Sequence, residues 1–252
     1  MMRLAPARPR FRRALLAVVL VVVAGRPAAA HHVGAYVPSD NEISANFKQI
    51  KFSIQAGKLD VALRLFESGA VRAEMRAQAA RLPAGLEEAT RAALGAGDGL
   101  RAERCLMVFF AWLSRDLALE ADRRLADMKE AAAARVTAGQ KFLEAIWRYY
   151  NLVDFAVSQY DPKAAVAVRL AFDEAEGYAR GGTSAGGNPG SKPGPVTGRA
   201  VQAPDPEKMR EPLQRMARIL SGLIDRAMTA KPMAVMPRAV MPKAGMPKAV
   251  MQ

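Results

Sequence analysis

The chain has 252 residues, of which 51% are hydrophobic, and it carries 37 Lys and Arg against 24 Asp and Glu, a net charge of +13. This charge lies at the two ends: residues 1–30 hold six Arg and no acid, and residues 180–252 hold twelve basic and four acidic side chains. Residues 31–179, with 19 basic and 20 acidic side chains, are nearly neutral. A nucleic-acid-binding domain needs a basic patch on its folded part, so we expect no nucleic-acid partner.

The first 30 residues have the three parts of a secretory signal peptide. Five Arg precede an apolar run of eleven residues, Ala14–Ala24, and Ala28-Ala29-Ala30 offers a small-residue cleavage site. The apolar run is shorter than the roughly 20 residues that a membrane-spanning helix needs. We therefore predict that residues 1–30 are a signal peptide, that the mature chain starts at His31, and that the protein is periplasmic or secreted.

Residues 31–180 are predicted to form one all-helical globular domain. Ser39 and Glu42 have the spacing of a capping box, which predicts a helix from there to Gly57, where a left-handed glycine can end it. Apolar residues at helical spacing predict further helices at 59–69, 70–82, 86–94, 100–128 and 134–159. From Arg115 to Lys129 charges alternate at helical spacing, which indicates a solvated face.

Asp161-Pro162 predicts the start of a last helix in this domain, because Asp is a good N-cap and proline suits the first helical position. Gly181-Gly182 is expected to end it. No alternating, β-branched run indicates a strand. The predicted fold is an all-α bundle of about six to seven helices, followed by a disordered linker and tail. Cys105, the single cysteine, lies among apolar residues and is expected to be a buried structural residue.

The remaining 72 residues divide into three parts by composition. Residues 181–206 are rich in Gly, Pro and Ser and are predicted to be a flexible linker. Residues 207–229 are predicted to form an amphipathic helix that folds back on the bundle, pairs with a second copy, or lies on an anionic membrane surface. Residues 230–252 repeat the pattern P-x-A-x-M, and a proline every fifth residue predicts a disordered tail. Weak membrane-surface contact is accordingly expected through residues 207–252.

The only two histidines are His31 and His32, at the predicted mature N-terminus. No histidine remains for a Ser-His or Cys-His pair, and no glycine-rich phosphate loop follows a strand, so we do not expect an enzyme. The terminal amine and the two imidazoles are nitrogen ligands that suit Cu(II). His31 and His32 are therefore a candidate copper site, the second of two metal hypotheses.

The first metal hypothesis is an iron site, because tyrosines and carboxylates gather between residues 144 and 178. Phenolate and carboxylate oxygens are hard ligands that suit ferric iron. The candidate ligands are Glu144, Tyr149, Tyr150, Asp154, Asp173, Glu174 and Glu176. The same residues also fit a structural alternative, in which buried aromatic rings with satisfied hydroxyls lie beside a solvated acidic helix end.

Two segments resemble known families, and each resemblance implies a different function. Residues 47–82, with ALRLFESG at 62–69, and FLEAIWRYYNLVDFA at 142–156 resemble the low iron-inducible periplasmic protein family. That resemblance implies an exported helical protein that serves iron assimilation. The Arg-Glu-x-x-Glu pattern of iron permease helices is absent, so it implies an accessory partner of a metal-uptake system and not a transporter.

The second resemblance is to a tetratricopeptide repeat. QAGKLDVALRLFESG, at 55–69, resembles the middle of such a repeat, with Gly57, Ala62 and Phe66 at the small and aromatic positions that let paired helices pack. Such repeats usually occur at least three times, and no recurrence at a 34-residue period is found here. The alternative function is therefore a helical-hairpin scaffold that binds proteins of the cell envelope.

Overall fold

The structure is a computed structural model, and it describes residues 38–181 and 203–229. These residues form eight helices and no strand, which confirms the all-α prediction. The predicted signal peptide, His31, His32, most of the predicted linker and the tail at 230–252 lie outside the described residues. Within the described ranges, none of the helices combines the length and the apolar character that crossing a bilayer requires.

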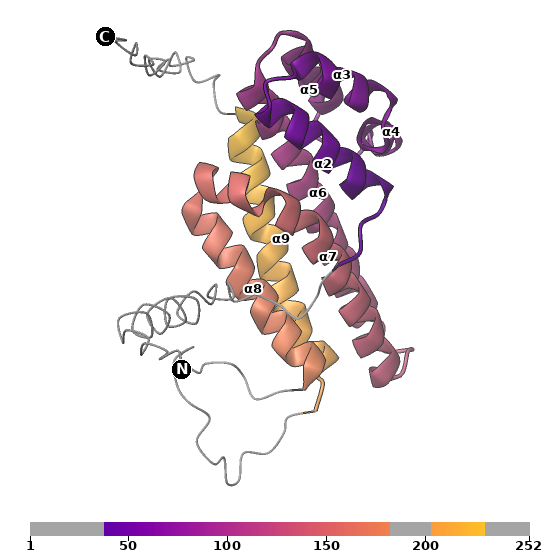
Figure 1. Ribbon diagram of the computed structural model, residues 1–252. Helices are drawn as coiled ribbons and strands as arrows, with labels where there is room; N and C mark the ends of the chain where they lie inside the picture. Colours follow the sequence, from indigo (N-terminus) through magenta and orange to yellow (C-terminus); the bar gives the residue numbers. More distant parts are fainter. Residues whose placement is uncertain (1–37, 182–202, 230–252) are drawn as a thin grey trace, which may run out of the picture. The chain divides into compact units, whose positions relative to one another are not determined.

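Four short helices are followed by four long ones (Figure 1). The short helices are α2 (Glu42–Gln55), α3 (Leu59–Ser68), α4 (Ala70–Ala77) and α5 (Leu86–Gly95). The long helices are α6 (Gly99–Leu125), α7 (Ala132–Tyr160), α8 (Pro162–Arg180) and α9 (Pro206–Thr229). Helix α6 is central to the packing, because it contacts α5, α7 and α9 extensively and α2 less so.

The start of α2 differs in detail from the sequence prediction. The capping box is formed by Asn41 and Ser44, not by Ser39 and Glu42: the Asn41 side-chain oxygen accepts from the Ser44 backbone N–H, and the Ser44 hydroxyl accepts from the Asn41 N–H, both at 2.9 Å. Asn and Ser can form the same reciprocal bonds as the Ser and Glu of the usual motif, so the helix begins two residues later than that motif suggests.

A buried asparagine joins α3 to α4. The Asn46 side chain donates to the Leu65 carbonyl and accepts from the Val71 N–H, both at 3.0 Å. It thereby satisfies backbone groups at the end of α3 and the start of α4, which helix termini leave without partners. Gly69 lies between the two helices, and a Cβ there would lie 2.3 Å from the Leu65 carbonyl oxygen. The joint therefore requires glycine because of close approach.

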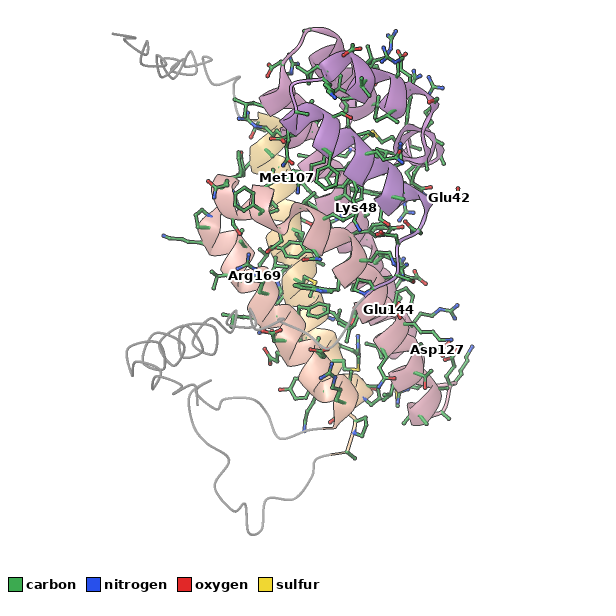
Figure 2. All side chains as sticks on the ribbon, viewed as in Figure 1. Glu42, Lys48, Met107, Asp127, Glu144 and Arg169 are labelled. Carbon is green, nitrogen blue, oxygen red and sulfur yellow. The ribbon has the colours of Figure 1, made fainter. Side chains whose placement is uncertain are left out.

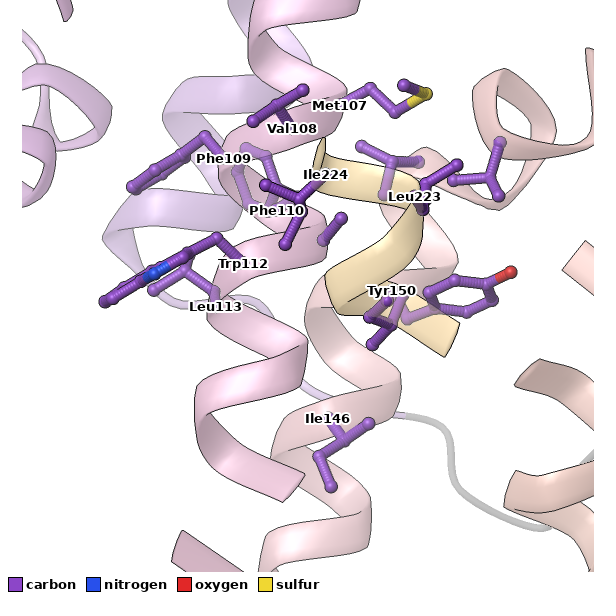
Figure 3. Packing of buried hydrophobic residues seen from close by; sticks show 14 of the residues in the cluster. Met107, Val108, Phe109, Phe110, Trp112, Leu113, Ile146, Tyr150, Leu223 and Ile224 are labelled. Atoms are coloured by element: carbon purple, nitrogen blue, oxygen red, sulfur yellow. The ribbon is translucent and has the colours of Figure 1, made fainter. Parts of the chain in front are cut away.

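The core of the long helices is continuous and rich in aromatic residues (Figure 3). Phe109, Phe110 and Trp112 on α6 are almost completely buried, and Leu223 and Ile224 on α9 belong to the same cluster. The apolar face of α9 is covered by α6 and α8. Of the arrangements considered for residues 207–229, the structure therefore has the helix folded back on the bundle.

Helices α7 and α8 form an antiparallel hairpin at Asp161. As the sequence predicts, the Asp161 carboxylate caps α8 by accepting from the Ala164 N–H at 2.9 Å, and Pro162 is the first helical residue. Gly181, with φ of 65°, ends the helix. At its far end, α8 is tied to the start of α9 by a hydrogen bond from the Asp205 N–H to the Tyr178 carbonyl, at 3.0 Å.

Candidate functional site

The two neighbouring tyrosines of the predicted iron site have different surroundings. The Tyr149 hydroxyl accepts a hydrogen bond from the Asn41 side-chain amide at 2.8 Å, and its ring centroid lies 5.9 Å from that of Phe110. Tyr149 therefore ties the N-cap of α2 to α7. Its hydroxyl is satisfied by protein, as the structural alternative expected for these aromatic residues.

Tyr150 is buried in the core beside an acidic residue. Its hydroxyl makes no hydrogen bond with any described residue. Burial, together with the negative charge of Asp154, raises the pKa of Tyr150 far above its ordinary value. The phenol is therefore neutral in the protein, and a metal that binds it must first displace a tightly held proton.

Asp154 itself is held by an arginine from the neighbouring helix. The Arg169 guanidinium donates to both carboxylate oxygens, with its Nε 2.8 Å from one of them, and it also donates to the Ser158 hydroxyl at 3.0 Å. This bidentate pair raises the pKa of Arg169. Arg169 lies on α8, as Figure 2 shows, so the pair fastens α8 to α7.

Three of the other carboxylates also have arginine partners. Glu144 pairs with Arg148 at 3.2 Å, and both lie on α7. On α8, Glu174 pairs with Arg215 of α9, and the buried Glu176 pairs with Arg180. The exception among the described residues is Asp173, an exposed residue whose pKa is raised by partial desolvation and by the neighbouring charge of Glu176.

The structure thus brings together Tyr150 with Asp154 and Asp173 with Glu176, but it does not gather the seven residues into one site. In residues 38–181 and 203–229, no group of three or more His, Cys, Asp or Glu is placed to hold a metal ion. The iron site stays a prediction, and His31 and His32 lie outside these ranges. Cys105 is half-buried, and burial raises the pKa of its thiol, which opposes a nucleophilic role.

Sequence reasoning did not anticipate four large, exposed apolar side chains on the helices α2, α7 and α8. They are Phe52 (67% exposed), Phe155 (69%), Val166 (53%) and Leu170 (62%), and we call this set the apolar surface. Two contacts show that its three helices are neighbours: the Lys51 ammonium on α2 donates to the Leu152 carbonyl of α7 at 3.3 Å, and Arg169 of α8 pairs with Asp154 of α7.

Sequence reasoning also missed a pocket beside Trp112. The pocket has a volume of about 440 Å³ and lies between the α4–α5 connection, α6 and the end of α9. Trp112 lines it, together with Arg81 and Arg115, whose guanidinium carbons lie 5.5 and 5.6 Å from the Trp112 ring. The only signal in the sequence is that Trp112 and Arg115 lie one helical turn apart.

Comparison of this chain with family models, with characterised proteins and with solved structures finds no match.

Proposed function

We propose that this chain is an exported helical binding protein whose partner is another protein, and that the apolar surface is where the partner docks. The observation that carries the proposal is the exposure of two Phe and two aliphatic side chains on three neighbouring helices. Isolated exposed hydrophobic residues are ordinary on soluble proteins, whereas a contiguous apolar patch marks an interaction surface, and we propose that these four side chains form one. The signal-peptide pattern of residues 1–30 supports export.

The pattern on α8 favours a helical partner. Val166 and Leu170 are four residues apart and therefore share one face, and this face continues to Lys163 at one end and Asp173 at the other. All four side chains are exposed. An amphipathic helix of another protein could bury its apolar side against Val166 and Leu170 and place opposite charges near the two ends. This keeps the protein-binding function of the scaffold hypothesis but proposes a surface on α2, α7 and α8 in place of the hairpin at residues 55–69.

The test is site-specific crosslinking in the exported fraction. A photoreactive amino acid at Gln159, which is exposed one turn beyond Phe155, should give a discrete crosslinked product with an envelope protein, identified by mass spectrometry. The double variant Phe155→Asp, Leu170→Glu should abolish this product, because burial of each large apolar side chain contributes about 1.5–3 kcal/mol.

The matched control is Met128→Glu, which introduces a charge at an equally exposed apolar residue beyond the far end of α6. The control should leave the product unchanged. An equal loss in both variants, or a product that persists in the double variant, would contradict docking on the apolar surface. A product between two copies of this chain would identify self-association in place of a different partner.

Iron acquisition is the second candidate function. The observation that favours it is the placement of Asp173 and Glu176 one helical turn apart on α8, because carboxylate oxygens are hard ligands that suit ferric iron. Elemental analysis of mature protein should then show stoichiometric iron, with a phenolate charge-transfer band that falls in Tyr149→Phe, Tyr150→Phe. An unchanged spectrum in the double variant would show that neither tyrosine binds the iron. Copper in place of iron would favour His31 and His32 as the metal site.

A further inference from the structure

Three connections between helices meet at one end of the bundle. The α2–α3 turn packs against the α5–α6 turn, since the position of a Cβ at Gly99 lies 3.1 Å from a side-chain methyl of Ile54 and 3.6 Å from one of Leu59. In the second turn of α6, the Arg104 guanidinium carbon lies 5.7 Å from the centroid of the Tyr160 ring, at the end of α7. The first turns of α6 therefore adjoin both the α2–α3 turn and the α7–α8 turn.

Basic side chains without an anionic partner gather at this end. Four of them form no ion pair with any residue in the described ranges: the exposed Lys58, Arg101 and Lys163, and the half-buried Arg104. Leu100, directly before Arg101 in the first turn of α6, is 73% exposed. We call these five residues the cationic end.

The carboxylates near the cationic end are already engaged by other groups. They are Asp60, paired with Arg64, Asp161, paired with Arg226, Asp98, which accepts from the Arg101 backbone N–H, and the half-buried Glu103, which interacts with the charge of Lys51. Even with all four counted in full, basic residues outnumber acidic ones here. This end of the bundle therefore has a net positive charge that neighbouring side chains do not neutralise.

Helix α9, for which the sequence predicts membrane contact, is a poor candidate for that role. Three of its four arginines pair with carboxylates of α6, α8 or the turn between α7 and α8: Arg210, Arg215 and Arg226. Its apolar face is covered by α6 and α8. The Arg226–Asp161 pair, at 2.6 Å, nevertheless places the last turn of α9 at the cationic end. Residues 230–252, with four basic and no acidic side chains, follow directly from there.

The distribution of these groups selects the class of partner. Cations on three separate connections suit anionic groups that are spread over a surface better than they suit one small anion. A phospholipid bilayer presents such groups above an apolar layer, which an exposed leucine can enter. We propose that the cationic end binds the surface of an anionic phospholipid bilayer, with its exposed cations at the headgroups and Leu100 at the boundary of the acyl chains. Export, which the signal-peptide pattern predicts, would bring the chain next to such a surface.

The test is co-sedimentation of the full mature chain with unilamellar vesicles of defined composition. The chain should bind phosphatidylcholine vesicles that contain about 30% phosphatidylglycerol and should not bind pure phosphatidylcholine. Raising the salt concentration from about 0.05 M to about 0.5 M should release it, because salt screens the attraction. Vesicles contain no protein, and the cationic end shares no residue with the apolar surface, so this proposal and the proposed protein docking can fail independently.

A double variant and a matched control locate the contact. Lys58→Gln, Arg101→Gln should lower the partition coefficient by about 25-fold, because each basic residue near anionic lipid contributes about fivefold. The control, Lys129→Gln, Lys141→Gln, removes the same charge from two exposed lysines that also form no ion pair with a described residue. They lie near the far end of α6, whose length of about 40 Å is several Debye lengths, so the control should change binding by less than about twofold.

The apolar part of the contact has its own pair of variants. Leu100→Ser should lower the partition coefficient by about three- to tenfold, because a leucine at the lipid boundary leaves water only in part. Met128→Ser changes an equally exposed apolar residue, 72% exposed beyond the far end of α6, and should have no effect.

Three results would overturn the proposal: equal binding to vesicles with and without phosphatidylglycerol, equal losses in the two double variants, or no loss in Leu100→Ser. A further variant replaces the four basic residues of 230–252 by Gln. It should weaken binding but leave the Lys58 and Arg101 substitutions effective. If it abolishes binding while those two substitutions do nothing in the parent chain, residues 230–252 alone contact lipid and the proposal is wrong. The substituted residues of the bundle are exposed, so unchanged thermal unfolding separates a loss of binding from a loss of fold.

Discussion

The short helices α2–α5 and the long helices α6–α9 are held together in different ways. Among the short helices, polar side chains satisfy the helix ends: Asn41 caps α2, and Asn46, inside α2, bridges the end of α3 and the start of α4. The buried residues of α3 are only Ala62 and Phe66, whereas α9 alone buries ten residues. A helix of two or three turns has little side-chain surface to bury, so its ends decide its position. The position of a long helix is set instead by side-chain packing along its whole length.

This contrast predicts opposite tolerance for alanine at two glycines, one in each region. Gly69→Ala should lower the free energy of unfolding by about 3 kcal/mol, because its Cβ would overlap the Leu65 carbonyl and the Asn46 amide, which cannot move without breaking the joint. Gly139→Ala, on α7, should change it by less than about 1 kcal/mol. There the nearest atom, at 2.5 Å, is the terminal methyl of Met209, a flexible side chain that can turn away. Urea denaturation of the mature protein measures both. Equal losses would show that the two regions do not differ in this way.

The next largest effect is expected at the pair that fastens α7 to α8. Arg169→Leu should destabilise the protein by about 2 kcal/mol, because it leaves the largely buried Asp154 carboxylate without its bidentate partner. Arg64→Leu is the matched control in the short-helix region. Its ion pair with Asp60 is exposed on both sides, and such pairs contribute less than about 0.5 kcal/mol. If Arg64→Leu lowers the free energy of unfolding as much as Arg169→Leu does, the difference in exposure does not determine how much the two ion pairs contribute.

The smallest effect concerns the pH dependence of the α7–α8 turn. The backbone N–H of Ala164 and the ion pair with Arg226 hold the pKa of Asp161 below its ordinary value. The carboxylate therefore contributes stability that is fully present above about pH 4 and is lost as the pH falls through the lower folded-state pKa. Asp161→Asn keeps an N-cap side chain but removes the charge. It should cost about 0.5 kcal/mol at pH 7 and progressively less as the pH falls below about 4, as measured by thermal unfolding across this range. A pH-independent difference would assign the effect to the cap alone.

Local signals in the sequence were sufficient for most of the fold. Pro162 after Asp161, and Gly57 and Gly181 at helix ends, act through their own backbone and side chain, and the structure has each in its predicted role. The role of Asn46 could not be predicted in this way, because its partners lie 19 and 25 residues further along the chain. Its position in the α2 pattern shows only that it is near the buried face.

The candidate sites were harder to predict for the same reason. Arg115 stands at the start of a charge-rich stretch that predicts a solvated face, yet the end of α9 and the α4–α5 connection enclose it. Similarly, Tyr149 and Tyr150 are adjacent in sequence and were grouped as ligands, but successive residues on a helix point about 100° apart, so one meets Asn41 and the other the core. Which charged residue pairs with which depends on neighbouring helices, and the sequence pattern does not contain that information.

The hydrogen bond from the Asp205 N–H to the Tyr178 carbonyl holds together the two ends of the 25 residues between α8 and α9. Because the two ends of this stretch are held against each other, a change in its length alters the entropy of closing a loop. That entropy changes slowly, by about 0.6 kcal/mol for each doubling of length. Through this entropy a change of length costs the helices little, while α9 is kept in place by its own contacts with α6 and α8.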